Sequence, residues 1–298
     1  MASIICLGIA VRDLVFSVPT LPPVTQKTTA SAFHKRGGGM AATAAVAAAA
    51  LGGSASYWGR LGGDDTGREL RRELESYGVR VCTVQVPGTL TPTATVLVAG
   101  NGERMLTVFP GLLDDSADWL PLSEVGTAQA VHADFRWPLG ARTLYEAAIA
   151  KGIPRVLDAD IGGATTVSSL LPLVDHAIFS RLGLVELSGS EDTEAGLRKA
   201  AALNGGVVAV TLGEQGSLFL VDGTVHRIPA PVIAARDTNG AGDVFHGAYT
   251  LALAEGRTVI DAARFATAAA ALKCANGSGW DAAPGRASVD NYLRELKW

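Results

Sequence analysis

Short apolar segments alternate with segments of helical pattern from about residue 50 onward, and this alternation restricts the fold more than any other feature of the sequence. Apolar runs bounded by turn residues are typical of buried strands. The expected strands are 56–58, 130–133, 155–157, 176–179 and 207–211, and the expected helices are 40–51, 66–77, 141–151, 194–203, 241–254 and 258–273. Alternating strands and helices predict βαβ units, and therefore a mostly parallel sheet that helices cover on both faces.

The residues near the N-terminus follow a different pattern. The run 3–11 is apolar, but it has no basic leader and is followed by charged residues, so it is expected to form a first buried strand and not a signal peptide. The segments 13–33 and 91–108 are rich in Pro, Thr and Val, which predicts short strands of a small separate β-sheet. Two interpretations of this sheet stay open, a lid that excludes water from a site or a pair of immobile edge hairpins.

Length and composition are those of a globular α/β protein. The chain has 298 residues, of which 48% are hydrophobic and 18% charged, enough for one large core with a small appendage. The expected division is a core of residues 1–12, 36–88 and 110–298 and a lid of residues 13–35 and 89–109.

Charge and cysteine content exclude several classes of function. The 25 Lys and Arg residues are scattered among 29 Asp and Glu without a basic run, so no nucleic-acid partner is expected. No apolar stretch reaches the ~20 residues of a membrane-spanning helix, so no membrane partner is expected. Cys6, Cys82 and Cys274 lie far apart, which indicates neither a disulfide framework nor a zinc site and fits a reducing, cytoplasmic compartment. A small molecule is the expected ligand.

The segment 236–243, Arg-Asp-Thr-Asn-Gly-Ala-Gly-Asp, immediately precedes an apolar helical pattern. Its small residues 240–242 let the backbone approach a phosphate, and a helix that begins there directs unpaired N–H groups and its positive dipole end at the anion. Asp243, in the first turn, would be placed to take a proton from a hydroxyl group. The alternative is that Asp237 or Asp243 only caps the helix.

This segment resembles the C-terminal motif of the PfkB, or ribokinase-like, family of carbohydrate kinases. The resemblance implies a ribokinase-like three-layer α/β/α core with a mostly parallel central sheet and a small β-sheet lid, and transfer of a phosphoryl group from ATP to a sugar hydroxyl. By matching position, Asp243 would be the catalytic base. The amides of Gly240, Ala241 and Gly242 would form the anion hole, and Asp237 and Thr238 would lie near the phosphates, with Asp237 beside a monovalent cation such as K⁺.

The N-terminal half agrees with this resemblance. Gly37-Gly38-Gly39 runs into an alanine-rich helix, and a second glycine-rich segment follows at 59–67. Both are similar to the first motif region of the family, which implies that Gly38 and Gly39 bind substrate hydroxyls. Thr43 stands where the family commonly has Asn, so contacts there would differ. Asp13, after the first strand, matches an Asp that binds the sugar in the family.

The expected nucleotide site combines two segments. Residues 211–217, Thr-Leu-Gly-Glu-Gln-Gly-Ser, resemble the family turn that lines ATP, although a plain hairpin turn would use similar residues. The cofactor-binding residues implied are Thr211, Gly213, Gly216, Thr238, Gly240, Gly242 and Asn276. The family commonly has Asn-x-x-Glu at the position of Ser-Arg-Leu-Gly, 180–183, so the acid that organises Mg²⁺ is left open among Glu186, Asp158 and Asp160.

Arg136, which follows the expected strand 130–133, bears on the substrate. A guanidinium at such a strand end needs an anionic partner, either a ligand or an internal acid such as Asp134. The chain is similar over nearly its full length to the branch of the family that phosphorylates 6-deoxy-6-sulfofructose at its C1 hydroxyl in sulfoquinovose breakdown. That resemblance implies that Arg136 binds the sulfonate and that Lys27 of the lid strand helps to bind it. In a homodimer formed through the lid, this Lys27 would come from the other subunit.

Two neighbouring side chains are expected to be structural. His246 lies one turn after Asp243 and is expected to pack against the nucleotide pocket, and Trp137 is expected to fill the core. The alternatives are a PfkB kinase for another sugar or sugar acid, such as 2-keto-3-deoxygluconate, fructose or ribose, and a non-catalytic sugar-binding relative.

Overall fold

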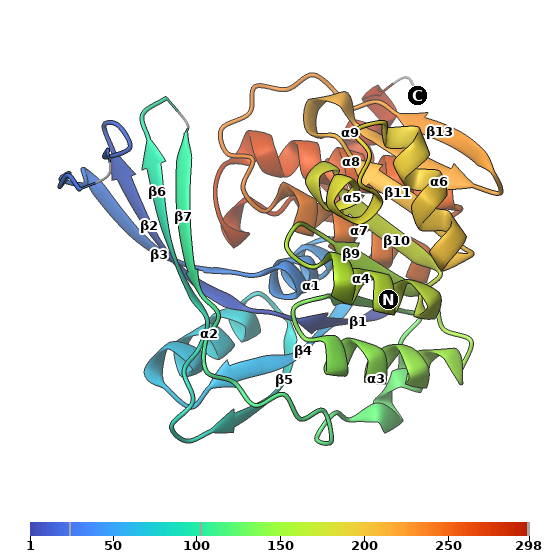
Figure 1. The fold of residues 1–298 in the computed structure, drawn as a ribbon, viewed down its shortest axis with the longest axis horizontal. Helices are drawn as coiled ribbons and strands as arrows, with labels where there is room; N and C mark the ends of the chain where they lie inside the picture. Colours follow the sequence, from blue (N-terminus) through green and yellow to red (C-terminus); the bar gives the residue numbers. More distant parts are fainter. Residues whose placement is uncertain (24, 102, 297–298) are drawn as a thin grey trace.

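The computed structural model describes residues 1–23, 25–101 and 103–296. Within these residues the chain forms a large α/β body with a small β-sheet that stands to one side of it (Figure 1). Residues 24, 102 and 297–298, which belong to the expected lid and core segments, lie outside this description. The division of the chain into a core and a lid stays a prediction.

The body is built on a nine-stranded sheet in the order β13-β12-β11-β10-β9-β8-β1-β4-β5. All pairs from β11 to β5 are parallel, and only β12 and β13 are antiparallel. The strands are β1 (Ser3–Gly8), β4 (Ser54–Gly62), β5 (Arg80–Val86), β8 (Ala130–Asp134), β9 (Arg155–Ala159), β10 (His176–Ser180), β11 (Val207–Thr211), β12 (Ser217–Val221) and β13 (Thr224–Ile228). The mostly parallel sheet predicted from the alternating pattern is confirmed.

Helices cover both faces of this sheet, which gives three layers (Figure 1). One face packs on α1 (Met40–Ala50), α2 (Asp65–Ser76), α7 (Ala241–Ala254), α8 (Val259–Asn276) and α9 (Arg286–Glu295). The other packs on α3 (Pro138–Ile149), α4 (Ala164–Leu170), α5 (Arg181–Ser188) and α6 (Thr193–Asn204). Short 3₁₀ turns are η1 (Leu122–Thr127), η2 (Leu171–Leu173), η3 (Gly213–Gln215) and η4 (Trp280–Ala282). None of the helices in the described ranges has the length and apolar character needed to cross a bilayer.

Helix α1 is a run of buried alanines that lies between the sheet and α7. A Cβ added to Gly247 of α7 would lie 2.2 Å from the carbonyl oxygen of Ala44, so the two helices touch backbone to backbone. Small side chains are the condition for such close packing. This contact holds the first turn of α7 near the glycine-rich start of α1.

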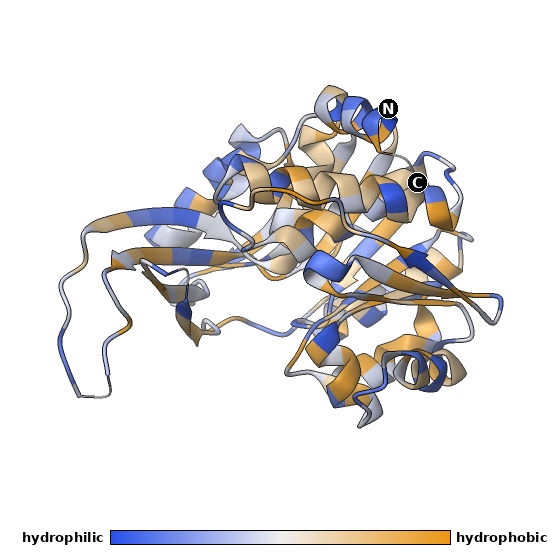
Figure 2. Ribbon diagram, turned by 90° about the horizontal axis from the view of Figure 1, so that it is seen from above, coloured by the Kyte–Doolittle hydropathy of each residue, from blue (hydrophilic) through white to orange (hydrophobic). Residues whose placement is uncertain are grey.

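The small sheet has the order β3-β2-β6-β7 and projects from the body (Figure 2). Its strands are β2 (Val11–Val18), β3 (Ala32–Gly38), β6 (Thr93–Ala99) and β7 (Arg104–Phe109). The central pair β2–β6 is parallel, and the two outer pairs are antiparallel. The small separate β-sheet predicted from the two Pro- and Thr-rich segments is confirmed.

The first strand differs from the prediction. It ends at Gly8 and not at residue 11, because the chain turns there and Val11 already belongs to β2 of the small sheet. Gly8 has φ +148°, and a Cβ on it would lie 2.1 Å from the buried Asp134 carboxylate, so only glycine fits this turn. Asp13 therefore lies in the small sheet and not at the end of a main-sheet strand. The pattern also missed β5, β12, β13, α4, α5 and α9.

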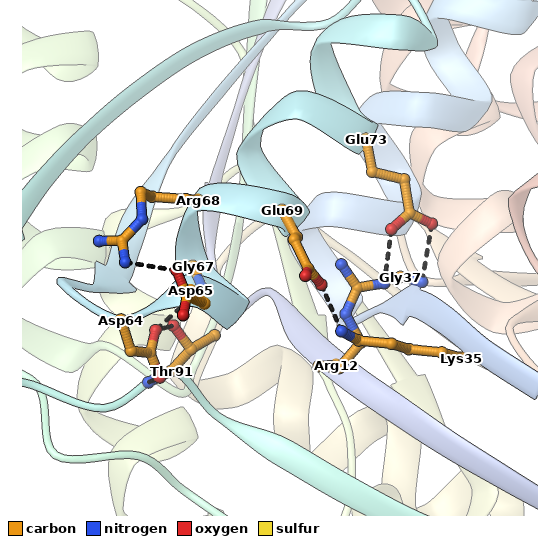
Figure 3. A network of polar contacts seen from close by, with 10 residues as sticks. All are labelled: Arg12, Lys35, Gly37, Asp64, Asp65, Gly67, Arg68, Glu69, Glu73 and Thr91. Carbon is orange, nitrogen blue, oxygen red and sulfur yellow. Dashed lines mark hydrogen bonds and ion pairs between the residues drawn. The ribbon is translucent and has the colours of Figure 1, made fainter.

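Acidic side chains of α2 and its N-cap hold the base of the small sheet (Figure 3). Arg12 of β2, only 3% exposed, pairs with Glu73, whose other oxygen accepts a hydrogen bond of 2.9 Å from the amide of Gly37. Two further contacts join Lys35 to Glu69, and Thr91, just before β6, to Asp64. Helix α2 thus fixes three of the chain crossings between body and small sheet.

Candidate active site

A cleft of about 750 Å³ lies between the small sheet and the carboxyl ends of the parallel strands. This edge is where open parallel sheets bind their ligands. Ten of the residues predicted from the sequence line it: Asp13, Gly38, Gly39, Thr43, Arg136, Thr211, Asp237, Gly240, Gly242 and Asp243. The others, Lys27, Gly213, Gly216, Thr238, Ala241 and Asn276, lie outside the lining. Both halves of the chain thus contribute to one cavity.

The start of α7 provides an anion site in this cleft. Gly240 has φ +75° and is the N-cap, and the first intrahelical bond runs from Val244 N–H to the Gly240 carbonyl. No side chain of the described residues caps the helix, so the alternative that Asp237 or Asp243 is its cap is wrong. The Ala241 amide bonds the Thr238 carbonyl at 3.3 Å, whereas the space beside Gly242 is open. The N–H groups of the first turn therefore face the cleft, where a phosphate would accept them.

Asp243 lies in this first turn, part-exposed to the cleft. Burial, strengthened by the negative charge of Asp158, raises its pKa to about 8, while His246 acts in the opposite direction. A carboxyl group whose pKa lies near neutral pH can both take up and release a proton. The geometry is that of a base beside an anion site.

His246 packs beneath the helix start. Its Nδ1 lies 2.8 Å from the Gly242 carbonyl oxygen and 3.2 Å from Asp158 Oδ2, and its Nε2 lies 3.3 Å from the Ile178 carbonyl oxygen. Asp158 Oδ2 has no hydrogen-bond partner among the described residues. Burial lowers the pKa of His246 and raises that of Asp158. The contact supports the first turn of α7, and no local pattern indicated it because Asp158 is 88 positions away from His246.

Asp237 is surrounded by cationic side chains. Its carboxylate pairs with Arg104 of β7 at 2.6 Å and accepts the Asn239 amide at 2.8 Å. The ammonium of Lys273 donates to the carbonyl oxygens of Asp237, at 3.0 Å, and of Asn239. Burial acts to raise the pKa of Asp237, but the pKa lies below its usual value. It is lowered by hydrogen bonds from Asn239 and Ser278 and by the positive charges of Lys273 and Arg104.

These contacts test the expected monovalent cation. A K⁺ ion at this position would need oxygen atoms that carry no other cation. The Asp237 carboxylate and the two carbonyl groups are already bonded to Arg104 and Lys273. The residues present do not fit K⁺, and neither Arg104 nor Lys273 was identified from the sequence.

The substrate side of the cleft depends on close approaches to β2. Burial raises the pKa of Asp13 to about 6, against the opposing charges of Arg12 and Arg36. A Cβ on Gly38 would lie 2.5 Å from the Asp13 carboxylate, and Gly39 has φ +98°. Both positions require glycine for steric reasons, in addition to any role in binding.

Thr43 has a partner that sequence reasoning missed. Its hydroxyl accepts a 2.9 Å hydrogen bond from the indole N–H of Trp280, which η4 places in the cleft wall. A Cβ on Gly37 would lie 2.3 Å from the same indole. Trp280 is 237 positions from Thr43, so no local pattern could have predicted this contact.

Arg136 does not pair with Asp134. The Asp134 carboxylate accepts the backbone amides of Ile9, Ala41 and Arg136 at 2.8, 3.2 and 2.9 Å. The exposed guanidinium of Arg136 lies over the Phe135 ring and donates to the Ile161 carbonyl at 3.2 Å. None of the described acidic side chains forms an ion pair with it. The internal-acid alternative with Asp134 is therefore wrong.

Lys27 lies in the exposed loop between β2 and β3 and not in a strand, outside the cleft of its own chain. The prediction that Lys27 lies on a strand of the lid is therefore wrong, and its role in binding the sulfonate stays a prediction.

The expected nucleotide residues have structural contacts of their own. Thr211 ends β11, and its hydroxyl donates to the Phe179 carbonyl at 3.3 Å. Residues 211–217 form the β11–β12 hairpin, in which a Cβ on Gly216 would lie 2.0 Å from the Ile228 carbonyl oxygen, whereas the space beside Gly213 is open. The Asn276 amide donates to the Ala282 carbonyl at 3.1 Å. The turn is thus a hairpin in form, with Thr211 at the cleft.

No group of three or more His, Cys, Asp or Glu side chains in the described segments could hold a metal ion. Asp158, Asp160 and Ser180 line the cleft, but burial raises the pKa of Asp158 well above its usual value, and Glu186 accepts the Gly162 amide at 2.8 Å. Mg²⁺ commonly binds through one or two carboxylates, waters and substrate phosphates, so Asp160 fits a role in holding a metal–nucleotide complex.

An anion site at a helix start, a carboxyl group beside it and a cleft at the carboxyl edge of a parallel sheet define a phosphotransferase of the α/β class. The chain belongs to the pfkB family of carbohydrate kinases, whose family model matches residues 1–284. It is a sugar kinase, which transfers a phosphoryl group to an alcohol acceptor.

Named relatives extend over the whole chain. A ribokinase of Bacillus subtilis is 28% identical over 298 residues, which cover 98% of this chain and 100% of that protein. The structure of a Giardia lamblia ribokinase has a TM-score of 0.90 with 25% identity and covers 99% of both chains. An Arabidopsis thaliana ribokinase, solved in complex with ribose and ATP, has a TM-score of 0.85 with 26% identity and covers 98% of both chains.

Proposed function

We propose that this protein transfers the γ-phosphoryl group of ATP to the C1 hydroxyl of 6-deoxy-6-sulfofructose and yields sulfofructose 1-phosphate, in sulfoquinovose catabolism. The observation that carries the proposal is the exposed Arg136 guanidinium, which lines the cleft together with Asp13 and Asp243 and pairs with none of the described acids. A guanidinium in this position suits a sulfonate, because it offers several N–H donors in one plane. The resemblance to the sulfofructose branch supports the same assignment.

The reaction is a direct in-line transfer. Asp243 takes the proton of the acceptor hydroxyl while the oxygen of that hydroxyl bonds to the γ-phosphorus of ATP. The bond between the γ-phosphorus and the β,γ-bridging oxygen breaks at the same time, and ADP is released. The amides of Gly240 and Gly242, which line the cleft, bind the charge that spreads over the transferring group, whereas the Ala241 amide bonds the Thr238 carbonyl. We propose Thr211, Gly213, Gly216, Thr238 and Asn276 as the nucleotide side of the cleft, and the ATP complex of the Arabidopsis relative supports this cofactor.

Mg²⁺ would accompany ATP, with Asp160 as the carboxylate offered by the protein. When bound, the ion neutralises the charge of the β- and γ-phosphates. The monovalent cation expected at Asp237 is not part of this proposal. Use of ATP and three free cysteines fit a cytoplasmic enzyme.

We also propose that residues 13–35 and 89–109 form a lid through which two copies of the chain associate. Phe33, Met105 and Phe109 of the small sheet lie outside the cleft lining and are 54%, 45% and 41% exposed, and a second lid would cover such apolar side chains. Lys27 of the partner subunit could then approach the cleft, where it would add a positive charge for the sulfonate.

A neutral sugar is the second candidate, because the Bacillus relative that matches the whole chain is named a ribokinase. A panel of ADP-release assays with sulfofructose, fructose, fructose 6-phosphate, ribose and 2-keto-3-deoxygluconate separates the two. We expect the highest kcat/KM with sulfofructose. A higher value for ribose or fructose would assign the enzyme to that sugar.

Arg136→Ala tests the sulfonate assignment directly. We expect KM for sulfofructose to rise at least tenfold while KM for fructose changes less than twofold, since only the first sugar has an anion to lose. Arg142→Ala is the matched control, because Arg142 lies on the exposed side of α3 and pairs there with Glu146. An equal rise for both sugars would remove Arg136 as the sulfonate ligand.

A further inference from the structure

Lys273 is unusual because it is a nearly fully buried lysine. It lies in the last turn of α8, only 1% exposed, yet it lines the cleft directly behind residues 237–240. Lysines are rarely buried without a partner for the ammonium group. Burial lowers the pKa of Lys273, while the Asp237 carboxylate acts to raise it. The ammonium group of Lys273 must therefore have contacts that compensate for its burial.

Those contacts all go to the segment that leads into the anion site. The ammonium donates to the carbonyl oxygens of Asp237 and Asn239, the residues on either side of Thr238. The amides of Arg236 and Asp237 bond the carbonyl of Cys274, the next residue of α8. The end of α8 thus holds the segment through both backbone and side-chain contacts.

Arg104 completes the arrangement from the other side of the cleft. It comes from β7 of the small sheet, and its guanidinium pairs with the Asp237 carboxylate. Two fixed positive charges therefore satisfy one carboxylate and two carbonyl groups. Oxygen sets of this kind are what a dehydrated K⁺ ion binds. A further cation there would be repelled by both side chains.

We propose that Lys273 and Arg104 are built-in cations that hold residues 237–240 in the anion-binding conformation, so that phosphoryl transfer by this enzyme needs no monovalent cation. Lys273 is a positioning residue, which acts through the carbonyl groups that precede Gly240. The inference rests on the kinase activity, but it does not depend on which sugar is the substrate.

The wild-type enzyme gives the first test. ADP release is measured with Tris-ATP and Mg²⁺, and with whichever sugar of the panel is turned over, in KCl, NaCl and tetramethylammonium chloride at equal ionic strength. We expect kcat/KM to agree within twofold in the three salts. Activation by K⁺ beyond that range overturns the proposal.

Lys273→Met gives the second test. In sodium buffer we expect kcat/KM to fall at least a hundredfold, and K⁺ to restore it at least tenfold, because the freed carbonyl groups can then bind the ion. A second readout needs no turnover: K⁺ should raise the melting temperature of Lys273→Met and leave that of the wild type unchanged. A folded variant that responds to K⁺ in neither assay overturns the role of Lys273 as a cation.

Lys199→Met is the matched control. Lys199 also donates to a backbone carbonyl, that of Ser188 at 2.6 Å, but it lies on α6 and outside the cleft lining. We expect wild-type kcat/KM and no response to K⁺ from this variant. Should Lys273→Met fail to fold, the wild-type salt series alone decides.

Discussion

Asp243 shows how one carboxyl group acquires its chemistry from its neighbours. Burial disfavours its charged form, the Asp158 charge adds to the effect, and together they raise its pKa to about 8. The same helix turn directs amide N–H groups at the cleft, so a hydroxyl that loses its proton to Asp243 lies beside the anion site. In the proposed mechanism, proton transfer and charge stabilisation therefore both come from one turn of α7.

Asp243→Asn should remove the base and leave the shape of the cleft nearly unchanged. We expect kcat to fall at least a hundredfold, in the range of a lost general base, with ATP and sugar binding within threefold of wild type. Turnover is measured by ADP release and binding by calorimetry. Wild-type turnover in this variant would exclude Asp243 as the base.

The pH profile follows from the same group. If Asp243 is the base, its carboxylate is the active form, and a pKa near 8 means that a growing fraction of the enzyme carries protonated Asp243 as the pH falls below 8. At saturating ATP, kcat/KM for the sugar should therefore drop about eightfold between pH 7.5 and 6.5. Below about pH 6 the drop should steepen, because Asp13 also takes up a proton there. A flat profile from pH 6 to 8 would contradict the assignment.

At the scale of elements, α2 and the α1–α7 pair place the two sides of the cleft. The backbone contact between Ala44 and Gly247 fixes where α7 begins relative to the glycine-rich start of α1. The acids of α2 fix the strands of the small sheet where they leave the body (Figure 3). The α1–α7 contact depends on small side chains, whereas the contacts of α2 with the small sheet depend on ion pairs.

Glu73→Gln tests the contribution of the Arg12–Glu73 ion pair to stability. Arg12 is nearly buried, so the loss of its carboxylate partner should lower the free energy of unfolding by about 3 kcal/mol. Glu69→Gln on the same helix is the control, because Glu69 and Lys35 are each 41% exposed and should contribute at most about 1 kcal/mol. Urea unfolding followed by circular dichroism measures both. Equal effects of the two substitutions would show that burial of Arg12 is not the cause.

At the scale of the whole molecule, the small sheet exposes apolar side chains that the body does not cover. If two lids associate, Met105→Asp with Phe109→Asp should convert a dimer to a monomer in sedimentation velocity, because buried carboxylates are costly at an apolar contact. Leu182→Asp, a change at a 60% exposed position on α5, is the control and should leave the dimer intact. A wild-type chain that sediments as a monomer up to 100 μM, about the highest practical concentration, would end the lid-dimer proposal.

Local sequence patterns determined much of this protein. The alternation of apolar runs and helical segments predicted the mostly parallel sheet, and the small residues before α7 predicted an anion site beside Asp243. These features depend on residues that are close in the chain, whose periodicity and conformational freedom can be read directly. The short α4, α5 and β12–β13 segments were missed because a few residues carry too little pattern.

Only the tertiary structure decided which distant side chains meet. The end of β1 at Gly8 follows from the position of the Asp134 carboxylate, more than a hundred residues away. The Arg104–Asp237 pair, the Lys273 contacts and the Thr43–Trp280 bond join segments that no periodic pattern relates. Such contacts depend on which segments the fold brings together and on how deeply they are buried, and a linear sequence shows neither. The charged groups around residues 237–243 could therefore be identified only from the tertiary structure.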